Sequence, residues 1–142
     1  MRRVIALAVL LTATLSPTHC WAVEADRTVI ETLMGEAGGQ GVIGMQAVAE
    51  VIRTRARQRH LTPAAVCLQK WQFSYWNIGT ISNRKFQAKT VDQAIKAWEL
   101  SKTSSITKGA DHYYADYIKK PKWAQKMQQT VKIGRHIFYK SY

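Results

Sequence analysis

The sequence predicts one α+β domain, in which helices come first and a small antiparallel sheet comes last. Apolar residues recur at helical spacing through the first two thirds of the chain. Past Gly109, aromatic and β-branched residues gather around a turn signal instead, which favours strands. The chain has 142 residues, a length that suits a single domain. Helices and strands that are segregated along a chain are typical of the α+β class.

Two helices are expected to flank a glycine-rich loop. Asp26 can cap the first helix, which runs to about Glu36. The second helix is expected to start near Gly44 and to bury its apolar residues, Met45, Val48, Ala49, Val51 and Ile52. Its outer end is basic, which suits a helix C-terminus, and it carries Arg53, Arg55, Arg57 and Arg59.

Two further helices and a sheet complete the expected domain. Pro63 is a favoured first helical residue, and Thr62 precedes it. Thr90 can cap the last helix, whose apolar residues are expected to be mostly inward, namely Val91, Ile95, Trp98 and Leu100. The segment 112–117 reads as a strand, and 131–133 with 136–139 read as a hairpin around Gly134.

The N-terminus has the order of a secretory signal. Arg2 and Arg3 precede an apolar run over 4–11, and a small residue, Ala22, ends a plausible cleavage site. The run is too short for a comfortable membrane span of about 20 residues, although an uncleaved anchor is the alternative. We therefore expect residues 1–22 to be a signal peptide, residues 23–142 to be the functional domain, and the mature protein to have no stable membrane insertion.

The mature chain would keep one cysteine, Cys67, so it cannot form an internal disulfide. Cys67 lies in an apolar stretch and reads as a small buried hydrophobe rather than a nucleophile. No Cys/His spacing suggests a zinc site, and we expect neither a metal nor a cofactor.

The formal net charge of +12 attracts polyanions without choosing among them. Nucleic acid, an anionic membrane and an acidic cell wall are all compatible with this charge. However, no recognised nucleic-acid motif appears, and the basic residues are not confined to one amphipathic helix. A nucleic-acid partner is therefore not expected.

Glu36 is the carboxylate with the least ordinary position. Asp26 suits a first helical turn, and Glu31, Glu50 and Glu99 fit solvated helix faces. Glu36 instead lies at a helix end, where a negative charge opposes the helix dipole. Apolar neighbours and the glycine loop would hold its carboxyl in a cleft that favours the protonated form, as a general acid requires. The competing interpretation is an exposed glutamate before a loop.

Aromatic residues gather in three segments, over 71–76, 113–123 and 138–139. Sugar rings pack their C–H faces on aromatic rings, and Gln72, Ser74 and Asn77 offer polar groups for hydroxyls. In a small domain, at least half of these rings are expected to be core instead.

Four blocks, in order, resemble the SleB/CwlJ-type cell wall hydrolases, the family of the spore cortex-lytic enzymes. The first runs from Gly35-Glu36-Ala37 through the glycine loop to 44–52 and Arg55. The others are 71–74, with its Gln-Phe-Ser, then 109–114, and finally 121–124 with 133–139. The likeness spans roughly residues 28 to 139. The sequence departs from the motif at Gly38, where the family has arginine, at Gln40, where it has a second glutamate, and at Thr54.

The resemblance implies a lysozyme-like domain that acts on peptidoglycan as a lytic transglycosylase. Glu36 would protonate the oxygen between N-acetylmuramic acid and N-acetylglucosamine and then act as base on the C6 hydroxyl. The residues expected to bind substrate are Gln72, Ser74, Tyr113, Tyr114, Trp123 and His136. A structural role beside the hairpin is the favoured alternative for His136.

A hydrolytic glycosidase usually needs two carboxylates, so Gln40 favours the one-carboxylate route unless Asp111 or Asp116 lies nearby. A hydrolytic muramidase or glucosaminidase and an inactive peptidoglycan-binding module remain the alternatives. We expect a monomer that is secreted across the inner membrane to the periplasm or cell wall.

Overall fold

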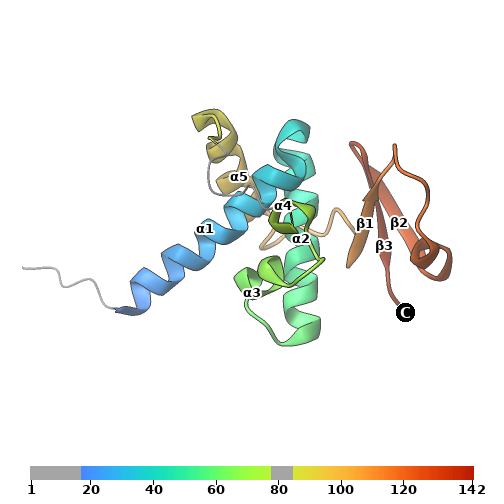
Figure 1. Ribbon diagram of the computed structural model, residues 1–142, viewed down its shortest axis with the longest axis horizontal. Coiled ribbons are helices and arrows are strands. Elements are labelled where there is room, and N and C mark those ends of the chain that lie inside the picture. Colours follow the sequence, from blue (N-terminus) through green and yellow to red (C-terminus); the bar gives the residue numbers. More distant parts are fainter. Residues whose placement is uncertain (1–16, 78–84) are drawn as a thin grey trace, which may run out of the picture.

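The computed structural model describes residues 17–77 and 85–142, with side chains from Arg27 onward. Five helices precede three strands among these residues: α1 (Pro17–Ala37), α2 (Gly41–Arg59), α3 (Pro63–Leu68), α4 (Ser74–Asn77), α5 (Ala88–Leu100), β1 (His112–Ala115), β2 (Gln128–Ile133) and β3 (His136–Lys140). Short 3-10 turns cover Gly38–Gln40 and Lys122–Lys126. The helices form one lobe and the sheet lies beside it (Figure 1), so the predicted α+β class is confirmed.

The sheet has the order β1-β3-β2, and both pairs of neighbouring strands are antiparallel. Tyr113 lies opposite Phe138, and Ile133 lies opposite His136 across the hairpin. Gly134 turns that hairpin with a φ of 55°, a left-handed conformation that glycine adopts without strain. The predicted strand and hairpin are therefore both present.

Helix α2 is the centre of the domain. On one side, its Met45, Val48 and Ile52 are fully buried in a core that α1, α3 and α5 complete. On the other side, Ala47 and Val51 pack against Phe138 of β3. Because α2 contributes to both clusters, it joins the helical lobe to the sheet and fixes the space between them.

The first two helices begin earlier than the sequence predicts. Helix α1 starts at Pro17, a residue that suits the first helical position, so Asp26 lies inside the helix and does not cap it. The predicted signal cleavage site after Ala22 therefore falls within α1, and residues 1–16 lie outside the described part of the chain. Helix α2 starts at Gly41, directly after the 3-10 turn, rather than near Gly44.

The last helix begins at Ala88 after Gln87, so Thr90 lies in its first turn and does not cap it. Trp98 is buried as expected, but Ile95 and Leu100 are 48% and 42% exposed. The reason is that α5 approaches α2 through the small, fully buried side chains of Ala94 and Ala97. By contrast, the expected start of α3 is confirmed, since the Thr62 hydroxyl accepts a hydrogen bond from the Ala65 amide at 3.2 Å.

Cys67 is fully buried, as the sequence predicts, and burial raises the pKa of its thiol to about 11. It is therefore a neutral core residue rather than a thiolate. Within the part of the chain that the structure describes, no helix has the length and apolar character needed to cross a membrane.

Glu50 corrects an expectation, because it lies in the interior rather than on a solvated helix face. Its side chain is 5% exposed. One carboxylate oxygen accepts hydrogen bonds from the Ser104 hydroxyl and the Ile106 amide, at 2.5 and 3.0 Å. The other accepts from the amide and hydroxyl of Thr107, at 2.9 and 2.6 Å. Glu50 thus ties the loop between α5 and β1 to α2.

We expect Glu50→Ala to lower the free energy of unfolding by about 3 kcal/mol, because buried amide donors lose their acceptor. Glu99→Ala is the control, since Glu99 only pairs with Lys102 at the surface, and its expected cost is under about 1 kcal/mol. Urea denaturation measures both values. Equal costs would contradict the anchoring role of Glu50.

Candidate active site

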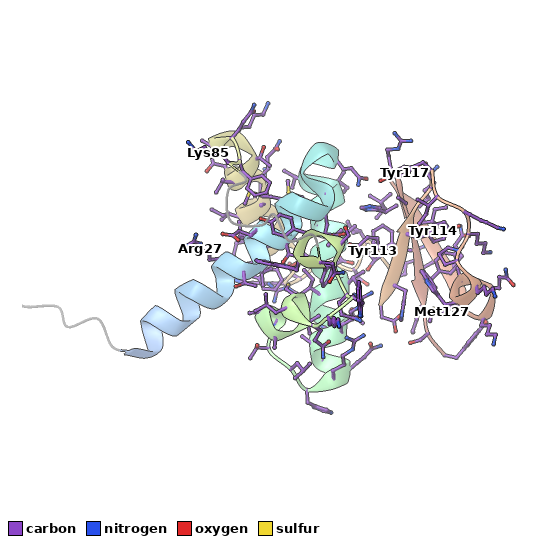
Figure 2. All side chains as sticks on the ribbon, in the orientation of Figure 1. Arg27, Lys85, Tyr113, Tyr114, Tyr117 and Met127 are labelled. Carbon is purple, nitrogen blue, oxygen red and sulfur yellow. The ribbon has the colours of Figure 1, made fainter. Side chains whose placement is uncertain are left out.

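A groove of about 520 Å³ runs between the helical lobe and the sheet. The seven side chains predicted from the sequence all line it: Glu36, Gln72, Ser74, Tyr113, Tyr114, Trp123 and His136. Tyr113 lies toward the helical lobe, whereas Tyr114 and Tyr117 lie on the sheet side (Figure 2). Residues from α1, the start of α4 and the segment before it, β1, the 3-10 turn over Lys122–Lys126 and β3 thus meet in one place, although their individual roles stay predictions.

The Glu36 carboxyl, near the end of α1, is held by three donors. Its Oε1 accepts hydrogen bonds from the Ser74 hydroxyl at 3.0 Å and from the Tyr75 amide at 2.8 Å. Its Oε2 accepts from the Tyr113 hydroxyl at 2.9 Å. The side chain is therefore oriented by both lobes and is not the freely exposed glutamate of the competing interpretation.

Either protonation state of Glu36 fits these contacts. The Tyr75 amide can only donate, so it fixes Oε1 as an acceptor. The Tyr113 hydroxyl can instead accept, so a proton on Oε2 has a partner when the carboxyl is neutral. A group that gives up a proton and takes one back needs such an environment.

Gly35 allows α4 to approach Glu36. A Cβ atom at this position would lie 2.2 Å from Cδ2 of Tyr75, closer than real Cβ contacts come. Thr32 lies one turn earlier on α1, and its hydroxyl accepts a hydrogen bond from the indole of Trp76 at 2.8 Å. This bond also holds α4 against α1. The glycine before the catalytic candidate therefore serves packing, and it lets the Tyr75 amide reach the carboxylate.

Tyr113 is a neutral phenol in this site. Burial, followed by the negative charge of Glu36, raises the pKa of the Tyr113 hydroxyl well above its ordinary value of 10. The hydroxyl therefore keeps its proton and can donate it to Oε2 of Glu36. Its ring lies 4.6 Å from that of His136, centroid to centroid, which fixes the phenol from the sheet side.

Gln40 takes the place of the motif's second glutamate, and it faces the hairpin. Its amide nitrogen donates to Nδ1 of His136 at 3.2 Å, while its amide oxygen accepts from the Arg135 amide at 2.8 Å. Gln40 does not line the groove. It therefore fastens the 3-10 turn to the sheet.

No second carboxylate was found in the groove among the described side chains. Asp111 is 2% exposed and its carboxylate accepts from Ser141 and Gln58. Burial alone would raise its pKa, but hydrogen bonds from His112, Ser141 and Gln58 prevail and lower it to about 2. Asp116 pairs with Lys132 at 2.8 Å and with Arg135. Each thus has a structural role away from Glu36.

Comparisons with known proteins agree with this geometry. A family model described as Cell Wall Hydrolase matches residues 39–139, which is more than half of the chain. The chain belongs to the cell wall hydrolase family. This hydrolase is therefore an enzyme of cell wall degradation, as the sequence predicted. The matched range begins just after Glu36, so the assignment of this residue rests on the contacts above.

Two solved structures resemble the hydrolase. One is the catalytic domain of the Bacillus cereus SleB protein, with 25% identity, a TM-score of 0.65, and 82% of this chain and 91% of that chain covered. The other is the catalytic domain of the germination-specific lytic transglycosylase SleB from Bacillus anthracis, with 23% identity, a TM-score of 0.67, and coverages of 92% and 100%. They confirm the lysozyme-like fold. No curated protein sequence matched the chain.

The remaining predicted residues form the outer parts of the groove of the hydrolase. The amide oxygen of Gln72 accepts from Arg59 at 2.9 Å, which holds one end. Trp123 contacts the rings of Tyr114 and Tyr139 edge-on, with centroids 6.0 and 5.6 Å away. Four of the ten rings in the three aromatic segments are buried, which is fewer than the expected half: Phe73, Tyr75, Phe138 and Tyr139. Two more, Trp76 and Tyr113, are partly buried and pack against the core.

His136 is 7% exposed, and burial lowers its pKa below the ordinary 6.5. The folded hydrolase therefore binds this proton less readily than the unfolded chain does, so His136 makes stability fall as pH drops below about 6.5. We expect His136→Gln to weaken the dependence of melting temperature on pH between about 5 and 7. The exposed His60 provides the control His60→Gln, which should keep the wild-type dependence. Identical slopes for all three proteins would contradict this role.

Arg55 is a charged groove residue for which the sequence predicted no role in the site. It was expected at the basic outer end of its helix, but it is 6% exposed and lines the groove. The motif likeness, which ends on Arg55, was the available signal.

Among the described residues, no group of three His, Cys, Asp or Glu side chains is arranged to hold a metal ion.

Proposed function

We propose that this hydrolase cuts the glycan strands of peptidoglycan between N-acetylmuramic acid and N-acetylglucosamine as a lytic transglycosylase. The observation that carries the proposal is that Glu36 is the sole carboxylate among the described residues that line the groove. The description of the Bacillus anthracis SleB domain as a lytic transglycosylase supports the same chemistry.

In the first step, the glycosidic bond breaks and Glu36 gives its proton to the departing oxygen of N-acetylglucosamine. The positive charge that develops on the muramic ring lies in the groove beside the new carboxylate. In the second step, the C6 hydroxyl attacks the C1 atom of the same ring, and Glu36 takes up the hydroxyl proton. The product has a 1,6-anhydro ring, and Glu36 regains its starting state without water.

The intramolecular attack explains why one carboxylate suffices. A hydrolase of the common kind needs a second carboxylate as a nucleophile or to activate water. In the anhydro route, the nucleophile belongs to the substrate and is already close to the reacting carbon. The enzyme then needs an acid that becomes a base, which matches the contacts of Glu36 with Tyr75 and Tyr113.

The other groove residues would orient the glycan. Gln72 and Ser74 offer polar groups on the helical side, and Tyr114 and Trp123 offer rings on the sheet side. The net charge of +12 would concentrate the enzyme on anionic wall polymers in a salt-dependent way. Residues 1–22 would direct export as a signal peptide, so that the enzyme reaches the wall as a monomer.

Mass spectrometry of the products tests this function. Purified sacculi are digested with the wild-type protein, and the new glycan ends are identified. The proposal predicts 1,6-anhydro-muramic ends. Reducing ends on muramic acid would indicate a muramidase and those on glucosamine a glucosaminidase, and either result would overturn the transglycosylase assignment.

A further inference from the structure

Arg55 is a buried cation without an ion-pair partner among the described residues. Its Nε atom donates to the Asp111 backbone carbonyl at 2.6 Å, a neutral acceptor. Its Nη1 atom is buried and has no hydrogen-bond partner. No ion pair within 4.0 Å joins the guanidinium to a carboxylate of the described residues, and the Asp111 carboxylate contacts Gln58, Ser141 and His112 instead.

Such an arrangement destabilises a folded protein. A buried N–H group without an acceptor loses its hydrogen bond to water without replacement, and an unpaired buried charge is more costly still. Burial lowers the pKa of Arg55, yet a guanidinium remains protonated in proteins. A positive charge is therefore fixed in the interior at the groove, where an opposite charge can offset it during the reaction.

Tyr113 interacts with both this charge and the catalytic candidate. Its hydroxyl donates to Glu36 Oε2 at 2.9 Å. It also interacts electrostatically with both Glu36 and Arg55, and the charges of these two residues have opposite effects on it. Arg55, Tyr113 and Glu36 all line the same groove, so the guanidinium can act on the carboxyl through the phenol.

We propose that Arg55 is a positioning residue that polarises the Tyr113 hydroxyl toward Glu36 and so stabilises the carboxylate left after proton transfer. The proposal rests on the proposed role of Glu36 as acid. When Glu36 is protonated, the three groups carry one positive charge in total. When Glu36 has given its proton to the departing oxygen, they are neutral overall. The fixed charge of Arg55 therefore favours the state that follows bond cleavage.

Other titrating groups also face this array. On the Glu36 side, they are Tyr113, Cys67 and His136, and His136 in turn is influenced by Asp116. On the Arg55 side, they are Tyr113, Arg59, Asp111 and Cys67. Cys67 and Tyr113 stay neutral because burial raises both pKa values, so neither adds a negative charge that would offset Arg55.

A double-mutant cycle tests the proposal. The variants are Arg55→Met, Tyr113→Phe, the double variant, and Arg55→Lys as the charge-conserving control. For each, kcat, KM and the pH profile of kcat/KM are measured on solubilised peptidoglycan strands. We expect Arg55→Met to lower kcat by about 10- to 100-fold with little change in KM. Arg55→Lys should recover most of that loss.

The pH profile distinguishes this role from a structural one. Without the positive charge, the carboxyl holds its proton to higher pH, so the high-pH limb of kcat/KM should move up by about half a pH unit or more. Arg55→Lys should leave the limb in place. In the Tyr113→Phe background, Arg55→Met should lower kcat by less than about threefold, because the hydroxyl through which Arg55 acts on Glu36 is absent.

Independent effects of the two substitutions, or an unmoved high-pH limb in Arg55→Met, would overturn the proposal. Circular dichroism and the melting temperature show whether each variant is folded. If Arg55→Met does not fold, Arg55→Gln replaces it in the double-mutant cycle. Product analysis of the wild-type protein keeps the two proposals separate. If the wild-type protein produces reducing ends and the double-mutant cycle still shows coupling between Arg55 and Tyr113, only the transglycosylase chemistry is rejected.

Discussion

Glu36→Gln is expected to reduce the release of muropeptides from sacculi by about 10³-fold or more. The amide has the size of the carboxyl, and its oxygen can still accept from the Tyr75 amide. It cannot give a proton to the departing oxygen, nor take one from the C6 hydroxyl. Both steps of the proposed reaction therefore fail together, while the free energy of unfolding should change by under about 1 kcal/mol.

Glu31→Gln is the matched control, because Glu31 lies on the same helix and only pairs with Arg27 on the surface. Its activity should stay within about twofold of the wild type. The rate of muropeptide release and the melting temperature are measured for all three proteins. If the Glu36 variant released muropeptides as fast as the wild type, Glu36 would not be the acid.

Gly35→Ala should have the second largest effect, because its methyl group has no room. The added Cβ would lie 2.2 Å from the ring of Tyr75, and that ring belongs to a 6% exposed side chain. Helix α4 must then move away from α1, and the amide of Tyr75 leaves Oε1 of Glu36. We expect activity to fall by about 10²-fold and the free energy of unfolding to fall by about 1–3 kcal/mol.

Gly39→Ala provides the control for the glycine loop. A Cβ at Gly39 meets no atom within 4 Å, and this residue lies four positions along the same segment. Its activity and melting temperature should stay close to those of the wild type. Similar losses in the two variants would show that glycine is needed throughout this stretch, and that contact with Tyr75 is not what Gly35 protects.

Features encoded by neighbouring residues could be predicted from the sequence. The start of α3 depends on Thr62 and Pro63, and the hairpin depends on Gly134, so local chemistry decides both. The gathering of groove residues depended on the ordered motif blocks. Glu36 itself had only a weak local signal, its position at a helix end.

Features that depend on distant contacts could not be predicted. Glu50 and Arg55 both occupy positions that look like solvated helix surface, yet the loop over 101–109 covers the first and the sheet covers the second. The close approach of Tyr75 to Gly35 joins residues forty positions apart along the chain. These contacts follow from the way the two lobes pack on α2, which sequence spacing does not encode.

Digestion of purified sacculi in water labelled with oxygen-18 tests the central claim most directly. An intramolecular attack by the C6 hydroxyl uses no water, whereas a hydrolase adds one water oxygen to each new reducing end. The mass spectrum of the new muramic ends is recorded after digestion by the wild-type enzyme. We predict unlabelled 1,6-anhydro ends. Reducing ends that carry one labelled oxygen would contradict a one-carboxylate transglycosylase centred on Glu36.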